Sequence, residues 1–262
     1  MQMEILTQEN TYRSPKRKIS FLARLAPSLV FYAKMIAIVL WSARLAKKGR
    51  YHGAEWTRAN LGNLEALESV GIRFTVENLH IIQNLDSPAV YVGNHMSSLE
   101  TFVLAGMIRP YQRVTYIIKE SLVSYPIFKH VMKSRDPILV TRVNPREDLK
   151  TVLSEGVIRL KDGISVIVFP QTTRFVSKDL TRFNTIGIKL ALRGGVPVVP
   201  FAVRTDAWGN GKRIKDFGKI DPSKPVHICF GDPIFPTGNG RKEHEAVVEF
   251  IAGKLNEWFP ET

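Results

Sequence analysis

A histidine and a nearby glutamate form the pair in this sequence that could take a proton from a substrate. An apolar, β-branched run ends just before His95, and an apolar run of helical length begins just after it, with Glu100 in its first turn. His95 is therefore predicted to lie on a turn between a buried strand and a helix N-terminus, where Glu100 can reach back to its ring. A carboxylate on one ring nitrogen fixes the tautomer and leaves the other nitrogen free to accept a proton.

The same residues also fit a purely structural interpretation. Ser97 and Glu100 have the spacing of a capping box, in which the glutamate accepts a hydrogen bond from the Ser97 backbone N–H. From the sequence alone both interpretations stay open, because a single histidine before a helix is a weak indication of catalysis.

Polar side chains at the ends of two other predicted strands could bind an anion. A proline turn follows the apolar strand that ends at Phe169, and it carries four polar side chains: Gln171, Thr172, Thr173 and Arg174. An arginine suits phosphate because its planar fork binds two oxygens at once. Lys119 ends another strand in a similar position. An ordinary polar loop and an exposed strand-end lysine remain the alternatives.

The sequence has no spacing typical of a metal or nucleotide site. The other histidines lack the spacing of metal ligands, and no glycine-rich phosphate loop is present. The single cysteine, Cys229, lies in an apolar run, which predicts a core position in a reducing compartment and excludes a disulfide framework. We therefore expect neither a metal nor a bound cofactor.

The positive charge of the chain is concentrated near its N-terminus. The formal net charge is +13, and residues 1–50 carry +8 of it, from ten Lys or Arg and two Glu. This excess coincides with apolar sequence, which favours an anionic membrane surface as the partner. A nucleic-acid partner is disfavoured, because no nucleic-acid-binding motif accompanies the charge.

The chain is predicted to have three parts. Residues 1–18 are expected to be a disordered basic tail. Residues 19–71 are expected to form an N-terminal helical membrane anchor, a hairpin in which the first helix runs from Pro27 to Lys48. The alternative for that helix is burial against the rest of the protein. A cleaved signal peptide is not expected, because the apolar run is long and lacks a cleavage site.

From residue 72 onward, strands alternate with helices. This alternation predicts an α/β fold with a mixed sheet that helices cover on both faces. The predicted strands are 73–77, 89–92, 114–118, 138–141, 165–169, 198–203 and 226–230, and the predicted helices are 98–108, 123–133, 145–161, 185–193 and 241–258. Sites in such sheets lie at the carboxyl ends of strands, so His95 and the stretch 170–174 could share one cleft.

Four ordered blocks resemble the glycerolipid acyltransferase family, whose best-known members are 1-acylglycerol-3-phosphate acyltransferases. The first family block, Asn-His-x-x-x-x-Asp, is similar to Asn94–Glu100. The second begins with a lysine and ends in an arginine, as in Lys119–Arg142. The third, Phe-Pro-Glu-Gly-Thr-Arg, resembles Phe169–Arg174, and the fourth matches Val196–Pro200. The order and spacing of the blocks together are fairly specific.

The resemblance implies that residues 72–262 form an acyltransferase domain. Such a domain would move a fatty acyl group from acyl-CoA or acyl carrier protein to the hydroxyl of a phosphorylated lysolipid, in phospholipid biosynthesis at the cytoplasmic face of a membrane. It implies that His95 is the general base and that Glu100 takes the role of the family's Asp. The acceptor's phosphate would be held by three cations: Lys119, Arg142 and Arg174.

Three departures from the family pattern affect the expected acceptor pocket, which would include Gln171, Thr172 and Thr173. Glu100 replaces Asp, Gln171 replaces Glu, and Thr172 replaces Gly. Because a glutamine cannot neutralise Arg174, the pocket is predicted to be more positive than usual. The alternatives are therefore an acyltransferase for a different lysolipid, or a catalytically weak relative that binds lipid.

Overall fold

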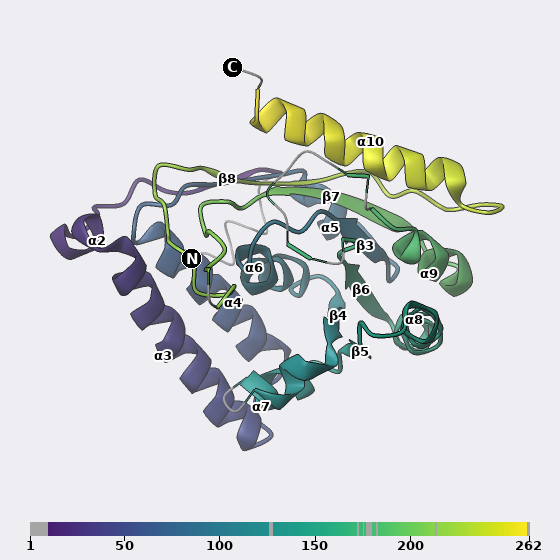
Figure 1. Cartoon of the computed structure of the whole chain (residues 1–262), viewed down its shortest axis with the longest axis horizontal. Helices are drawn as coiled ribbons and strands as arrows, with labels where there is room; N and C mark the ends of the chain where they lie inside the picture. The colour runs from purple at the N-terminus through teal and green to yellow at the C-terminus, as the bar shows by residue number, and fades with distance from the viewer. Residues whose placement is uncertain are drawn as a thin grey trace.

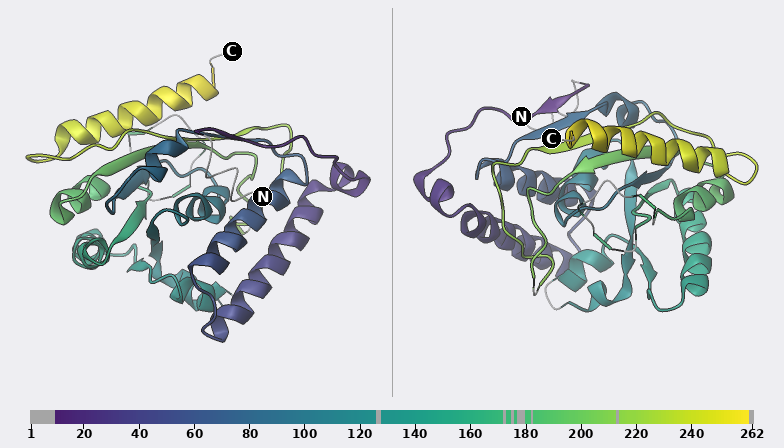
Figure 2. Two further views of the ribbon diagram at one scale, coloured as in Figure 1. Left: turned by 180° about the vertical axis from the view of Figure 1, so that it is seen from behind. Right: turned by 45° about the horizontal axis from the view of Figure 1, so that its top comes forward.

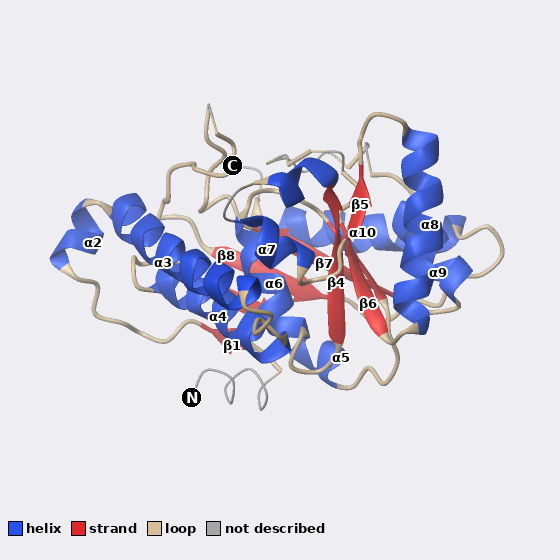
Figure 3. Ribbon diagram, turned by 90° about the horizontal axis from the view of Figure 1, so that it is seen from below, coloured by secondary structure: helices blue, strands red, loops and turns tan. Residues whose placement is uncertain are grey.

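A mixed sheet forms the centre of the fold. The structure is a computed structural model, and it describes residues 10–125, 128–171, 173–174, 176, 180–181, 183–212 and 214–260. Within these residues the sheet has eight strands: β1 (Tyr12–Arg13), β2 (Phe74–Glu77), β3 (Val90–Gly93), β4 (Arg113–Lys119), β5 (Ile138–Val140), β6 (Ile164–Val168), β7 (Val198–Arg204) and β8 (Val226–Phe230). Their order is β1-β2-β8-β7-β3-β6-β4-β5. Figure 3 draws the strands in red among the blue helices. The pairs β1–β2 and β7–β8 are antiparallel and the other pairs are parallel, which confirms the predicted α/β fold with a mixed sheet.

Helices cover both faces of the sheet, as predicted. The longer ones are α3 (Pro27–Lys47), α4 (Gly53–Glu68), α6 (Leu99–Ile108), α8 (Pro145–Lys161), α9 (Ile186–Gly194) and α10 (Arg241–Trp258), and the short ones are α2 (Phe21–Leu25), α5 (Leu79–Gln83) and α7 (Phe128–Lys133). Helices α3, α4 and α6 lie on one face, and α8, α9 and α10 on the other (Figures 1 and 2). Strand β3 is buried on both sides: Tyr91 belongs to one apolar core, and Val90 and Val92 belong to the other.

The predicted helix over residues 123–133 is replaced by two shorter elements. A 3₁₀ helix spans Glu120–Ser124 and α7 follows at Phe128, while residues 126 and 127 lie outside the described residues. The sequence contains Pro126 between them, and a proline has no N–H to continue a helical ladder.

The segment before α2 corrects the prediction of a disordered tail over residues 1–18. Tyr12 and Arg13 form β1 at the edge of the sheet, and Tyr12 is only 1% exposed. The hydroxyls of Tyr12 and Ser14 both donate to Oε1 of the buried Glu68, each at 2.6 Å, and Arg17 lies 3.2 Å from its Oε2. A buried carboxylate needs such partners, so α4 fixes this segment. Residues 1–9 lie outside the described residues.

Helix α3 buries one side and exposes the other. Among the described residues it is the one helix long and apolar enough to cross a membrane. It packs against α4, which gives the predicted helical hairpin. Its buried side presents Phe31, Met35 and Val39 to the core, whereas Leu29 on the other side is 66% exposed. The helix is therefore buried against the protein on one side, and its other side is open to solvent.

Gly93, at the end of β3, leaves no room for a side chain, which gives a testable prediction. A Cβ at this position would lie 2.3 Å from the ring of Phe201. We expect Gly93→Ala to lower the free energy of unfolding by about 1–3 kcal/mol, because a buried overlap forces the neighbours apart. Gly253→Ala is the control: it lies in α10 with no atom within 4 Å, and we expect it to add about 0.5–1 kcal/mol. Urea unfolding in detergent, followed by circular dichroism, measures both. Equal shifts would contradict the argument.

Candidate active site

The turn after β3 is held in place by a side chain that extends the sheet. Asn94 Nδ2 donates to the carbonyl of Val203 in β7, and the Val203 N–H donates to Asn94 Oδ1, both at 2.8 Å. The Asn94 amide thus repeats the hydrogen bonds of a strand after β3 has ended. The next residue, His95, is consequently fixed at the carboxyl end of β3.

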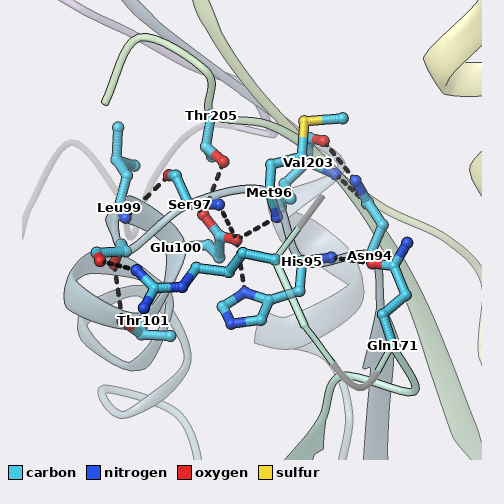
Figure 4. A network of polar contacts seen from close by, with 12 residues as sticks. Asn94, His95, Met96, Ser97, Leu99, Glu100, Thr101, Gln171, Val203 and Thr205 are labelled. Carbon is cyan, nitrogen blue, oxygen red and sulfur yellow. Dashed lines mark hydrogen bonds and ion pairs between the residues drawn. The ribbon is translucent and has the colours of Figure 1, made fainter. Parts of the chain in front are cut away.

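His95 and Glu100 are in contact. The imidazole Nδ1 lies 2.8 Å from Oε1 of Glu100. The same oxygen accepts the backbone N–H groups of Met96 at 2.7 Å and Ser97 at 2.9 Å (Figure 4). The histidine–carboxylate pair and the hydrogen bond expected of a capping box therefore exist together, and the two interpretations were not true alternatives.

Glu100 is completely buried and fully hydrogen-bonded. Its Oε2 accepts from Ser97 Oγ at 3.1 Å and from Thr205 Oγ1 at 2.7 Å. Burial by itself would raise the pKa of Glu100, but the hydrogen bonds from His95, Thr205 and Ser97 outweigh it and hold the pKa below its ordinary value. An ionised carboxylate can only accept, so His95 Nδ1 carries the proton and Nε2 is the basic nitrogen.

The ring and backbone of His95 have further support. The imidazole stacks on Phe169 with ring centroids 4.3 Å apart and an angle of 21° between the planes. The His95 N–H donates to Oε1 of Gln171 at 2.7 Å. The side chain of His95 is 14% exposed, and within the described residues its Nε2 has no hydrogen-bond partner. The imidazole is thus oriented on one side and open on the other.

His95 borders a cavity of about 750 Å³. Three more of the predicted site residues line the same cavity: Lys119, Arg142 and Gln171. Apolar side chains from the N-terminal hairpin and β4 line another part of it, including Ile38, Val39, Trp56 and Ile117. A cavity that combines cations with apolar walls matches a molecule with an anionic group and a hydrocarbon chain.

Arg142 has an unusual backbone conformation and a cationic neighbour. Its φ is +61°, in the left-handed region, and its N–H donates to Oδ2 of Asp148 at 2.7 Å. Burial, and then the charge of Arg174, lower the pKa of the Arg142 guanidinium. Two neighbouring cations repel each other, so an anion bound at this position would relieve the repulsion.

Arg174 is held by other polar residues and is not among the described residues that line the cavity. Its guanidinium forms an ion pair with Asp216 Oδ1 at 2.7 Å and donates to Ser98 Oγ. Asp216 therefore supplies the negative charge that Gln171 lacks. This corrects the prediction of an unneutralised Arg174, although Arg142 and Lys119 still make the cavity cationic.

Of the other two residues of the expected acceptor pocket, the structure describes one, Thr173. Thr173 is exposed, and its Oγ1 accepts from Lys215 Nζ at 3.4 Å. Thr172 lies outside the described residues. The side-chain carbonyl of Gln171 accepts a hydrogen bond from the His95 backbone N–H, so Gln171 supports the histidine and not Arg174.

Sequence reasoning missed two polar partners at this site. Thr205 directly follows β7, so the rule that polar residues at carboxyl strand ends form sites could have singled it out. Asp216 is 118 residues away from Ser98 in a long connection between strands, and no local pattern marks it.

A family model matches the part of the chain that contains this site. The model of the acyltransferase family matches residues 73–204, half of the chain. The chain belongs to this family. The matched segment runs from the residue before β2 to the end of β7 and contains every predicted site residue.

Two curated relatives are both named 1-acyl-sn-glycerol-3-phosphate acyltransferase. The chain is 34% identical over 132 residues to the 1-acyl-sn-glycerol-3-phosphate acyltransferase of Pseudomonas aeruginosa, which covers 50% of this chain and 49% of that protein. It is 25% identical over 244 residues to the enzyme of the same name from Cocos nucifera, which covers 92% of this chain and 74% of that protein. The chain thus spans about half the length of the Pseudomonas relative.

A solved structure shares the fold. The 1-acyl-sn-glycerophosphate acyltransferase PlsC of Thermotoga maritima superposes with a TM-score of 0.72 at 20% sequence identity. The superposition covers 92% of this chain and 98% of that one. The similarity therefore extends over most of both chains.

The lowered pKa of Glu100 predicts how stability depends on pH. A carboxylate whose pKa is lower in the folded state stabilises the fold above its unfolded value of about 4.3, and this contribution is lost as the pH falls through the folded value. We expect the free energy of unfolding of the wild type to fall more steeply below about pH 4.3 than that of Glu100→Gln. Urea unfolding at a series of pH values measures the slopes.

The matched control is Glu249→Gln, which removes an exposed carboxylate from α10. Its slope is expected to follow the wild type. If Glu100→Gln follows the wild type as well, Glu100 is not held ionised by its five donors.

Proposed function

We propose that this protein transfers a fatty acyl group from the thioester of coenzyme A or acyl carrier protein to the free hydroxyl of a lysophosphatidate-type lipid. The observation that carries the proposal is the state of His95. Its Nδ1 is held by a buried carboxylate, while its Nε2 is unpaired within the described residues beside a cavity that is cationic in one part and apolar in another. A protein that only binds lipid does not need a histidine with one nitrogen fixed by a carboxylate and the other open to the cavity.

The histidine performs the proton transfers of the proposed reaction. A lipid hydroxyl is a poor nucleophile at neutral pH, so His95 Nε2 takes its proton as the oxygen attacks the thioester carbonyl. The carbon–sulfur bond then breaks, and the imidazolium returns the proton to the departing thiolate. Glu100 stabilises the imidazolium between these steps. Such general base catalysis typically contributes ~10²–10⁴-fold, and the positioning of the two lipids adds to it.

Lys119 and Arg142 are proposed to hold the phosphate of the acceptor. Both line the cavity that His95 borders, and Arg142 sits near a second guanidinium that an anion would shield. Gln171 orients the histidine backbone from the same cavity. Arg174 is paired with Asp216 and bonded to Ser98, so it is assigned a supporting role beside Arg142.

The N-terminal helices are proposed to attach the protein to the cytoplasmic face of a membrane. Large apolar side chains of α2 and α3 face solvent: Phe21, Leu22, Leu25, Leu29, Ile36 and Leu40. On α3 the exposed ones recur at helical spacing and are followed by Arg44 and Lys47 in the last turn. An apolar stripe with flanking cations is typical of a helix that lies in the interface of an anionic bilayer.

Replacing His95 tests the proposed reaction. We expect His95→Ala to lower kcat by about 10²–10⁴-fold, since the general base is lost, while the four remaining donors still hold the buried Glu100 carboxylate. The assay is release of free thiol from acyl-CoA by purified protein in detergent with lysophosphatidate, and acyl carrier protein is tested as donor in parallel. His80→Ala, an exposed histidine of α5, serves as control. Wild-type turnover by His95→Ala would refute the mechanism.

Replacing the two cavity cations tests the acceptor site. We expect Lys119→Gln and Arg142→Asn each to raise the KM for lysophosphatidate by about 10–150-fold, because a charge-assisted hydrogen bond contributes ~1.5–3 kcal/mol. Asparagine is chosen because it tolerates the left-handed backbone of Arg142.

Two comparisons make this test specific. The KM for the acyl donor should stay unchanged, and so should the rate with monoacylglycerol, which has no phosphate. Arg241→Ala, on the exposed surface of α10, is the control. An equal loss of activity with lysophosphatidate and with monoacylglycerol would show that Lys119 and Arg142 do not bind the phosphate.

A further inference from the structure

The connection from β7 to β8 touches the N-terminal helix α3. We refer to the described residues 207–212 and 214–220 as the β7–β8 loop. The hydroxyl of Tyr32 donates to the carbonyl of Gly218 at 2.5 Å, and the Ile220 N–H donates to Ser28 Oγ at 3.0 Å. The rings of Tyr32 and Phe217 lie 5.2 Å apart. The loop is therefore packed against the helix that carries the exposed apolar stripe.

The same loop also touches the candidate active site. Asn210 Nδ2 donates to the carbonyl of Met96, the residue after His95, at 3.0 Å. Asp216 binds Arg174 at 2.7 Å and accepts from Ser98 Oγ at 2.9 Å. The position of the loop consequently fixes both the turn after β3 and the guanidinium of Arg174.

Large apolar side chains of the loop face solvent beside lysines. Ile214 is 60% exposed and Phe217 is 47% exposed. Lys212, Lys215 and Lys219 are also exposed. An apolar pair this exposed, surrounded by cations, matches the chemistry of an anionic bilayer interface, where apolar side chains enter below the headgroups and lysines meet the phosphates.

The loop surface is continuous with the stripe on α3. Tyr32, which packs against Phe217, lies one helical turn from both Leu29 and Ile36, and these two are 66% and 44% exposed. The two apolar surfaces therefore meet at Tyr32. A bilayer that contacts α3 can reach Phe217 without leaving a gap.

We propose that the β7–β8 loop is a second bilayer-docking element, which binds an anionic phospholipid surface together with α3 and thereby places the His95 site at the level of the lipid headgroups. The inference deepens the proposed function and rests on it, because the bilayer is the source of the lysolipid acceptor. Ile214 and Phe217 enter the interface, and the lysines bind lipid phosphates. Asn210 and Asp216 connect this contact to the catalytic turn.

The experiment compares bilayer-borne and dissolved acceptors in the full chain. Ile214→Ser with Phe217→Ser removes the apolar tip. We expect its binding to vesicles of phosphatidylcholine and phosphatidylglycerol, measured by lipid titration, to weaken about tenfold or more. Turnover of long-chain lysophosphatidate in these vesicles should fall in parallel. Turnover of a short-chain, water-soluble lysophosphatidate without vesicles should stay within about twofold of the wild type.

Two further variants test whether the loss of binding comes from the loop surface or from a change in folding. Lys212→Glu with Lys219→Glu leaves the apolar packing intact, and we expect it to weaken binding to the anionic vesicles but not to vesicles of phosphatidylcholine alone. Phe235→Ser, which removes a phenylalanine that is 66% exposed between β8 and α10, should bind vesicles as the wild type does.

The outcomes separate the proposal from its alternatives. Unchanged vesicle affinity in both loop variants overturns the docking proposal. The proposal is also overturned if a variant keeps its vesicle affinity but loses turnover equally on dissolved and vesicle-borne acceptors, because the role of the loop is then purely structural. If the wild type is a dimer and the Ile214→Ser, Phe217→Ser variant is a monomer that keeps its vesicle affinity, the apolar surface of the loop binds a second copy of the chain. That outcome also overturns the docking proposal. If the wild type is inactive on both acceptors while the variants lose vesicle binding, docking stands and the proposed activity fails.

Discussion

The buried carboxylate of Glu100 is the constraint on which the candidate site depends. Five donors converge on it: the ring of His95, two successive backbone N–H groups, and the hydroxyls of Ser97 and Thr205. A buried charge is tolerated only when it is satisfied in this way. The turn after β3, the start of α6 and the end of β7 must therefore keep their relative positions. The same contacts that stabilise the turn also set the tautomer of His95, so stability and chemistry depend on one group.

The rest of the site follows from the position of this turn in the sheet. Strand β3 lies between β6 and β7, and the carboxyl ends of these parallel strands bring three segments together: the His95 turn, the Phe169–Gln171 stretch and Thr205. Phe169 supports the imidazole from one side, and Gln171 fixes the backbone. The N-terminal hairpin then contributes apolar walls to the cavity. Reactive nitrogen, cations and apolar walls thus come from different parts of the chain.

Local sequence patterns predicted the parts of this arrangement that depend on near neighbours. The strand-turn-helix around His95 was predictable, because a β-branched run, a glycine and a capping sequence each have a local cause. Partners distant in sequence were not predictable. Thr205 is 105 residues from Glu100, and Asp216 is 118 residues from Ser98. The ordered segment at Tyr12 was missed for the same reason, since its polar, basic composition suggests disorder and only Glu68, 56 residues later, explains its burial.

The way α3 is built into the protein restricts how such a fold can change during evolution. Phe31, Met35 and Val39 share one apolar core with Tyr91 of β3 and Phe201 of β7, and the segment before α2 is fastened to α4 through Glu68. Helix α3 is therefore an integral part of the fold. A lineage that lost the chain up to the end of α3 would uncover core side chains and leave the Glu68 carboxylate without the partners that precede α2. Loss of the proposed membrane contact would instead have to proceed by polar replacements on the exposed stripe of α3, one residue at a time, with the buried side preserved.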